Sequence, residues 1–133
     1  MMEIRAYQDG DLAGIKGKRE DLTGVVGGWS FTVHKDGEPL VCFGCDKFWD
    51  GVGHIWMVAG SEIRGHGLEL LRLSRDMLNK TMDQFGYNRI QAYVSPESEE
   101  NARWVKLLGM RLECTLEKMS PDGSDIDVYK ITR

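Results

Sequence analysis

Two glycines, Gly65 and Gly67, are the residues of this sequence best suited to seat a ligand. They lie in "SEIRGHGLELLRL", between the apolar segment "HIWMVA" and an amphipathic run that predicts a helix. Such glycines let several backbone N–H groups point into one concavity, and the positive end of the helix dipole suits a pyrophosphate there. Arg64 can add charge-assisted hydrogen bonds. Spacing alone favours a structural turn, because short glycine pairs arise by chance in a chain with 16 glycines.

Two common nucleotide-binding motifs are not matched at this turn. Leu70 occupies the place of the third glycine in a Rossmann fingerprint, and the Gly-Lys-Ser/Thr ending of a P-loop is absent. Dinucleotide and nucleoside-triphosphate binding are therefore disfavoured.

A second candidate for chemistry is "CFGC", at Cys42 to Cys45. A redox Cys-x-x-Cys pair works at a helix N-terminus, whereas this pair falls in an expected strand. A structural zinc needs four ligands, and no second pair stands at metal spacing. We expect packed free thiols and no metal site. The other potential ligands are scattered along the chain, at His34, His54, His66 and Cys114.

Composition limits what these residues can belong to. The chain has 133 residues, 41% of them hydrophobic and 29% charged, which predicts one globular domain over residues 1–133. No apolar run approaches the roughly 20 residues of a membrane span, and the N-terminal segment lacks the apolar region of a signal peptide. The net charge of −4 argues against nucleic acid as a partner. Three cysteines without a secretory signal favour a reducing, cytoplasmic setting.

Hydrophobic patterning supplies the elements that must position these residues. Alternating or β-rich runs predict seven strands, and Asp36-Gly37 predicts a hairpin. A short or broken helix is expected within 9–28, a confident helix from Leu68 to Gly86, and another over 95–109 with Ser95 as its cap. The strands are expected at 2–8, 29–34, 39–46, 53–59, 87–94, 110–119 and 125–132.

The resulting order is β-α-β-β-β-α-β-α-β-β. It predicts an α+β protein with one mixed, mostly antiparallel sheet of about seven strands and helices on both faces. The β-α-β unit over 53–94 should be right-handed, which makes its two strands parallel. Ligands commonly bind in the crevice at the carboxyl ends of such strands.

The combination of these features resembles the GNAT superfamily of acyl-coenzyme A-dependent N-acetyltransferases. The family's motif A, Arg/Gln-x-x-Gly-x-Gly/Ala, is represented by the six residues from Arg64 to Glu69. A later family motif, an Asn followed by a helix that ends in "lyeklGF", looks like the stretch from Asn101 to Met110. The order of elements also matches, so the resemblance covers nearly the whole chain.

The resemblance implies acetyl-CoA as co-substrate and places it residue by residue. Backbone groups of Met57 and Val58 would pair with the pantetheine arm, and Asn101 would approach that arm. The acceptor would be an amine of a small molecule or a peptide. The pyrophosphate would be held by backbone amides of Arg64, Gly65, His66, Gly67, Leu68 and Glu69.

Two residues depart from the family pattern. Glu69 stands where the family prefers Gly or Ala, and its carboxylate would oppose the pyrophosphate unless it turns outward. The tyrosine that protonates the departing thiolate in many members would fall at Val105, so another group must supply that proton or the chain binds without efficient chemistry.

Acetyl transfer also needs a base to take the proton of the attacking amine. His54 is the candidate, because its ordinary pKa is near neutral and its strand frames the acceptor site in the family. The competing interpretation is a strand histidine that is hydrogen-bonded in or beside the core. Glu62 is an alternative base, or simply a solvated turn residue.

Two functions are therefore expected from the sequence. The first is an acetyl-CoA-dependent N-acyltransferase that acts on a primary amine. The second is a catalytically weak or inactive GNAT-like structural or interaction protein, because the chain also looks faintly like small GNAT-like virion-associated proteins of tailed phages. The resemblance further implies that the closing hairpin can meet its copy in a homodimer.

Overall fold

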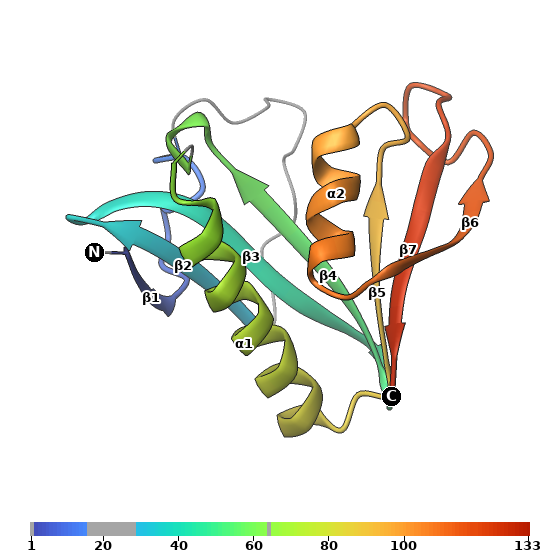
Figure 1. Ribbon diagram of the computed structural model, residues 1–133, viewed down its shortest axis with the longest axis horizontal. Helices are drawn as coiled ribbons and strands as arrows, with labels where there is room; N and C mark the ends of the chain where they lie inside the picture. Colours follow the sequence, from blue (N-terminus) through green and yellow to red (C-terminus); the bar gives the residue numbers. More distant parts are fainter. Residues whose placement is uncertain (1, 16–28, 64) are drawn as a thin grey trace. The chain divides into compact units, whose positions relative to one another are not determined.

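The computed structural model describes residues 2–15, 29–63 and 65–133, and within them it contains seven strands and two α-helices (Figure 1). The elements are β1 (Met2–Ala6), β2 (Trp29–Lys35), β3 (Glu38–Trp49), β4 (Val52–Ala59), the 3₁₀ turn η1 (Ser61–Ile63), α1 (Gly67–Phe85), β5 (Arg89–Val94), α2 (Glu99–Leu107), β6 (Arg111–Leu116) and β7 (Ile126–Thr132).

The strands form one mixed, mostly antiparallel sheet in the order β1-β2-β3-β4-β5-β7-β6. The chain divides into two compact units, each of which is described by itself below. The first unit comprises Met1–Asp46 and Ile55–Leu70, and the second comprises Lys47–His54 and Leu71–Arg133. β4 therefore begins in the second unit and ends in the first.

The first unit is built on the antiparallel strands β1, β2 and β3. The predicted hairpin between β2 and β3 is confirmed, since Asp36 (φ 52°) and Gly37 (φ 81°) both adopt the left-handed conformation that a two-residue turn requires. Both faces of these strands are buried: Val33 and Val41, which pair across β2 and β3, lie on one face, and Cys42 lies on the other, all three completely buried.

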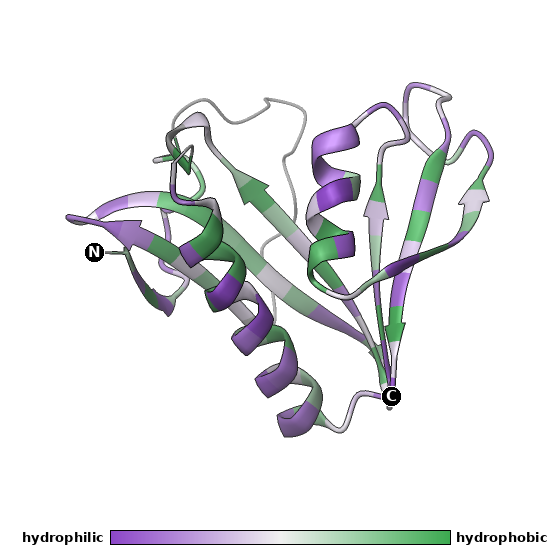
Figure 2. Ribbon diagram, in the orientation of Figure 1, coloured by the Kyte–Doolittle hydropathy of each residue, from purple (hydrophilic) through white to green (hydrophobic). Residues whose placement is uncertain are grey.

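The second unit contains the three neighbouring strands β5-β7-β6, α2, α1 from Leu71 onward, and the segment Lys47–His54. β7 pairs antiparallel with both β5 and β6, and hydrophobic and hydrophilic residues alternate along it (Figure 2). The buried residues of the second unit include Met82 of α1, Ile90 of β5 and Tyr129 of β7. α1 ends as predicted, because Gly86 takes a left-handed φ of 64° directly after Phe85.

The expected order of elements is wrong at its first helix. The structure has two α-helices in the described ranges rather than the three of β-α-β-β-β-α-β-α-β-β. Residues 9–14 form turns, because the Asp11 carboxylate accepts a hydrogen bond from the Gln8 amide and Gly10 takes a left-handed φ of 91°. The rest of that expected helix, residues 16–28, lies outside the described residues.

The second correction concerns the start of α2. Ser98, not Ser95, caps this helix, since its hydroxyl oxygen accepts from the Asn101 amide. Ser95 instead closes a separate turn, in which its carbonyl accepts from the Ser98 amide at 3.0 Å. Two serines three residues apart offered two possible caps, and the sequence pattern favoured the one that precedes proline.

Candidate functional site

The expected ligand-binding turn follows the end of β4 directly. The buried Gly60 donates its amide to the Leu40 carbonyl at 3.2 Å, which ties the end of β4 to β3. After η1, Gly65 adopts a left-handed φ of 86°, and the His66 amide donates to the Ile63 carbonyl at 3.0 Å. A left-handed glycine is what the chain needs to turn sharply into α1.

The first turn of α1 presents backbone donors to open space. The Leu70 amide donates to the His66 carbonyl, so the amides of Gly67, Leu68 and Glu69 before it have no acceptor within the helix. A Cβ built on Gly67 would meet no atom within 4 Å. These donors and this space fit the phosphate of a coenzyme at the positive end of a 19-residue helix.

Two side chains of the first turn of α1 bear on whether an anion can bind there. Leu68 is 65% exposed and Glu69 is also exposed, so neither fills the space over the helix N-terminus. The helix dipole stabilises the negative charge of Glu69, but the same charge repels an anion at the helix N-terminus. Arg64 and the side chain of Glu62 lie outside the described part of the chain.

The end of β4 is anchored by one face of the strand. Val58 is 4% exposed and packs with Ile15 and Cys42, while Trp56 contacts the same cluster. Alternation along the strand places the half-buried Met57 on the opposite face. The segment expected to pair with a pantetheine arm is therefore held by packing on the Val58 side.

His54 lies in an aromatic cluster of the second unit. Its ring stacks on Phe48, with ring centres 5.5 Å apart and planes 9° apart, and the Tyr93 ring meets it edge-on at 4.5 Å. Phe48 also contacts Trp49, which is 68% exposed at the end of β3. His54 is thus half-buried beside aromatic rings rather than enclosed in the core. Phe48 and Tyr93 could not be predicted as neighbours of His54, because nothing in the sequence pairs them with it.

The α2 residues of the expected site lie in the second unit as well. Asn101 belongs to the first turn of α2 rather than preceding it, and its side chain is exposed. Val105 is 7% exposed inside the same helix. A valine side chain has no proton to donate, so Val105 cannot take the role that the tyrosine has in many members of the family.

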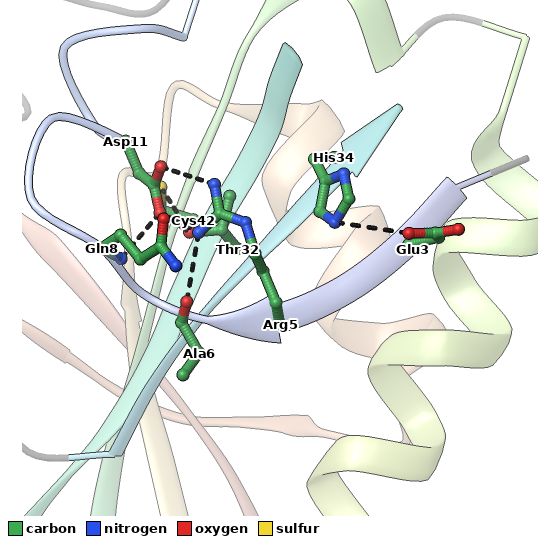
Figure 3. Close-up of polar contacts among 8 residues, drawn as sticks. All are labelled: Glu3, Arg5, Ala6, Gln8, Asp11, Thr32, His34 and Cys42. Carbon is green, nitrogen blue, oxygen red and sulfur yellow. Dashed lines mark hydrogen bonds and ion pairs between the residues drawn. The ribbon is translucent and has the colours of Figure 1, made fainter. Parts of the chain in front are cut away.

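An ion-pair network in the first unit was not anticipated from the sequence. The Arg5 guanidinium donates two hydrogen bonds of 2.7 Å to the Asp11 carboxylate, and Thr32 donates its hydroxyl to the same group at 2.7 Å (Figure 3). The Arg5 guanidinium, followed by the Thr32 hydroxyl and the Gln8 amide, holds the pKa of the Asp11 carboxyl far below its usual value, although burial opposes them. A buried acid in a glycine-rich turn leaves no recognisable spacing in the sequence.

Two of the three cysteines are packed thiols. Cys42 and Cys45 are buried in β3 and form no disulfide, as predicted, whereas Cys114 is exposed. Burial raises the pKa of the Cys42 thiol, which disfavours the reactive thiolate. Among the described residues, no group of histidines, cysteines and carboxylates could hold a metal ion. None of the helices in the described ranges is long and apolar enough to span a bilayer.

The expected site residues thus fall into two groups. Met57, Val58 and the described residues of the glycine turn lie together in the first unit, and His54 and Asn101 lie in the second. Each group is defined by its own contacts.

Solved structures with this fold include an acetyltransferase of the GNAT family and several N-acetyltransferases. An acetyltransferase of the GNAT family from Bacillus anthracis matches with a TM-score of 0.78 and 19% identity, covering 98% of this chain and 94% of its own. Ard1 from Thermoplasma volcanium matches with a TM-score of 0.81 and 13% identity, covering 98% and 97%. The ribosomal-protein-S18-alanine N-acetyltransferase from Escherichia coli matches with a TM-score of 0.74 and 15% identity, covering 99% and 94%.

The likeness is one of fold. No protein-family model matches the sequence, and no curated protein matches it significantly. The expected GNAT-like architecture is confirmed over nearly the full chain, with the corrected order of helices given above.

Proposed function

We propose that this chain is an acetyl-CoA-dependent N-acetyltransferase that moves an acetyl group to a primary amine. The observation that carries the proposal is the junction of β4 and α1 in a GNAT fold, where Gly65 turns the chain and the space beside Gly67 is open, next to amides that have no acceptor within the helix. Amides at a helix N-terminus with open space beside them are the common arrangement of an anion site in proteins.

The residues proposed to hold the coenzyme are those implied by the resemblance. The amides from Arg64 to Glu69 would bind the pyrophosphate, and the backbone of Met57 and Val58, with Asn101, would bind the pantetheine arm. Acetyl-CoA, when bound, supplies the activated acetyl thioester. A backbone amide at the end of β4 would donate to the carbonyl oxygen as negative charge develops there.

His54 is the proposed general base. A primary amine attacks only in its neutral form, so a group near neutral pKa must accept its proton, directly or through water. Contacts with Phe48 and Tyr93 restrict the orientation of the imidazole. Because Val105 cannot protonate the departing thiolate, the protonated His54 or a bound water would return that proton.

The decisive experiment is a turnover assay that measures release of the coenzyme A thiol in the presence of amines. The panel should contain peptides with free N-termini, lysine, spermidine and an aminoglycoside, because the neighbours by fold include enzymes for ribosomal-protein alanine and for spermidine. The proposed acceptor class is an amine of a small molecule or peptide, and the proposed setting is cytoplasmic.

Replacing the base gives the sharpest mutational test of this proposal. His54→Gln should lower kcat/KM by about 10² or more, since a positioned base contributes that much, while the dissociation constant for acetyl-CoA stays within about twofold. His66→Gln is the matched control, because this histidine belongs to the glycine turn through its backbone, and it should keep turnover. Equal turnover of His54→Gln and the wild type would remove His54 from the mechanism.

The buried Val105 supports a second candidate function, a GNAT-like structural or interaction protein with weak or no catalysis, such as a phage virion component or a homodimeric module. This candidate predicts a folded chain that releases no coenzyme A thiol with any amine of the panel. Acetyl-CoA binding without release would favour it over the enzyme.

A further inference from the structure

The turn between β3 and β4 is anchored to the start of β5, and all of these residues belong to the second unit. The Gly51 carbonyl accepts hydrogen bonds from the Asn88 amide at 2.9 Å and from the Arg89 amide at 3.1 Å. Gly51 itself has a left-handed φ of 84°, which the tight turn requires. Phe48 and His54, which lie on either side of the turn, are therefore held in defined positions relative to β5.

His54 lies against the face of the Phe48 ring. The imidazole and this ring are nearly parallel, with 9° between their planes and 5.5 Å between their centres. An aromatic face carries partial negative charge and attracts a cation that lies within about 6 Å of the ring centre. The contact with Phe48 therefore stabilises a protonated imidazole more than a neutral one.

Burial of the imidazole acts in the opposite direction, because it removes water from the charged form. His54 is half-buried, and the rings around it remain open to solvent, since Phe48 is 46% exposed and Tyr93 is 39% exposed. The two effects can be separated by Phe48→Leu. Leucine covers the imidazole as an apolar group but has no aromatic face, so the variant keeps the burial and removes the attraction.

The charged groups of the neighbouring segments are paired with one another. In the turn, Lys47 Nζ lies 2.6 Å from Asp50 Oδ1. On β5, the Arg89 guanidinium donates to the Glu113 carboxylate at 2.6 Å, and Lys130 of β7 lies 3.5 Å from the same carboxylate. Each of these three cations thus lies against a carboxylate, and all of them are kept in the variants proposed below.

We propose that Phe48 is a positioning residue that stabilises the protonated form of His54 during acetyl transfer. The inference rests on the proposed function, in which His54 takes a proton from the amine nitrogen as that nitrogen bonds to the carbonyl carbon and the carbon–sulfur bond breaks. The imidazolium then returns the proton to the thiolate. Phe48 acts through His54 and needs no contact with either reactant.

The test is an NMR titration of the histidine ring protons in the wild-type chain and in Phe48→Leu, without acetyl-CoA or amine. The titration midpoint of His54 should fall by about 0.5 pH unit in the variant, which corresponds to about 0.7 kcal/mol, as for a partly exposed cation–π contact. Phe48→Tyr keeps the aromatic face and should keep the midpoint. His34 and His66, which lie in the first unit, are internal references whose titration should stay the same.

The same difference should appear in the pH profile of turnover. His54 acts as a base only when it is neutral, so kcat/KM falls as pH drops through its titration midpoint. This acidic limb should move to lower pH by about 0.5 unit in Phe48→Leu and stay in place in Phe48→Tyr. Tyr93 is the titratable side chain whose ring contacts His54, at 4.5 Å between centres. Tyr93→Phe removes its hydroxyl, keeps the ring and should leave the limb in place.

Two results would overturn the inference. One is an unchanged or higher midpoint of His54 in Phe48→Leu, which would leave Phe48 a packing role alone. The other is a lower midpoint with an unmoved acidic limb, which would separate the contact from the reaction. Failure of the proposed function is distinguishable, because the wild-type chain would then release no coenzyme A thiol while the NMR difference persisted, and Phe48 would lose its catalytic role.

Discussion

Gly67 is the residue whose backbone the coenzyme proposal uses most directly. Gly67→Val should retain the fold, because an added Cβ meets no atom within 4 Å, but the side chain would occupy the space over the helix N-terminus. We expect the acetyl-CoA dissociation constant to rise by about tenfold or more, measured by calorimetry. Gly65→Ala is the contrasting variant: its φ of 86° should cost about 1–2 kcal/mol of stability. Unfolding of Gly67→Val would show that this glycine is structural.

The Asp11 carboxylate should make the free energy of unfolding depend on pH. Its folded-state pKa is lowered, chiefly by the Arg5 guanidinium, so the charged carboxylate stabilises the fold above the unfolded-state pKa near 4, and this stabilisation is lost as pH falls further. At pH 7, Asp11→Asn should therefore reduce the free energy of unfolding by about 2 kcal/mol. The difference from the wild type, measured by urea denaturation between pH 7 and pH 2, should shrink as pH falls. A difference independent of pH would contradict the ionic account.

Only some of the candidate site residues could be predicted from the sequence. The glycine turn was predictable, because glycine spacing before an amphipathic helix reflects local backbone needs that the structure confirms at Gly65. The ion-pair network of Arg5, Asp11 and Thr32 was not, since Thr32 lies 21 positions after Asp11 and the three residue types have no joint spacing. The cluster at His54 was hidden for the same reason, because its Tyr93 comes from another strand.

At the scale of elements, α2 offers a direct test of its corrected start. Ser98→Ala should lower the free energy of unfolding by about 1 kcal/mol, because the Asn101 amide loses its acceptor at the helix N-terminus. Ser95→Ala is the matched control and should cost less than half as much, since its hydroxyl contacts the Glu97 amide before α2 begins and caps no helical amide. Urea denaturation of the two variants measures the difference. The reverse order of destabilisation would favour a helix that starts at Ser95.

Strands and helices were predicted well where local signals agree. The hairpin at Asp36-Gly37 and the end of α1 at Gly86 each depend on a left-handed residue, and both are found. The expected helix after β1 failed over residues 9–14, because Asp11 bonds the Gln8 amide and draws its segment into turns that propensity alone does not predict.

At the scale of the whole chain, the fold is that of GNAT acetyltransferases although sequence identity to the solved structures compared is only 11–20%. The order of strands along the chain and the β4–α1 junction depend on the pattern of polar residues and glycines, and such a pattern is kept when most individual residues change. Side-chain clusters such as those at His54 and Asp11 are not encoded in that way, because their members come from distant positions in the sequence.

Binding of acetyl-CoA to the unmodified chain tests the central claim most directly. A ligand that binds only the folded state at 100 times its dissociation constant adds about 2.7 kcal/mol of stability, so saturating acetyl-CoA should raise Tm by several degrees. Gly67→Val, which fills the space over the amides of α1, should show little of this shift. An unchanged Tm of the wild-type chain at millimolar acetyl-CoA would contradict the account.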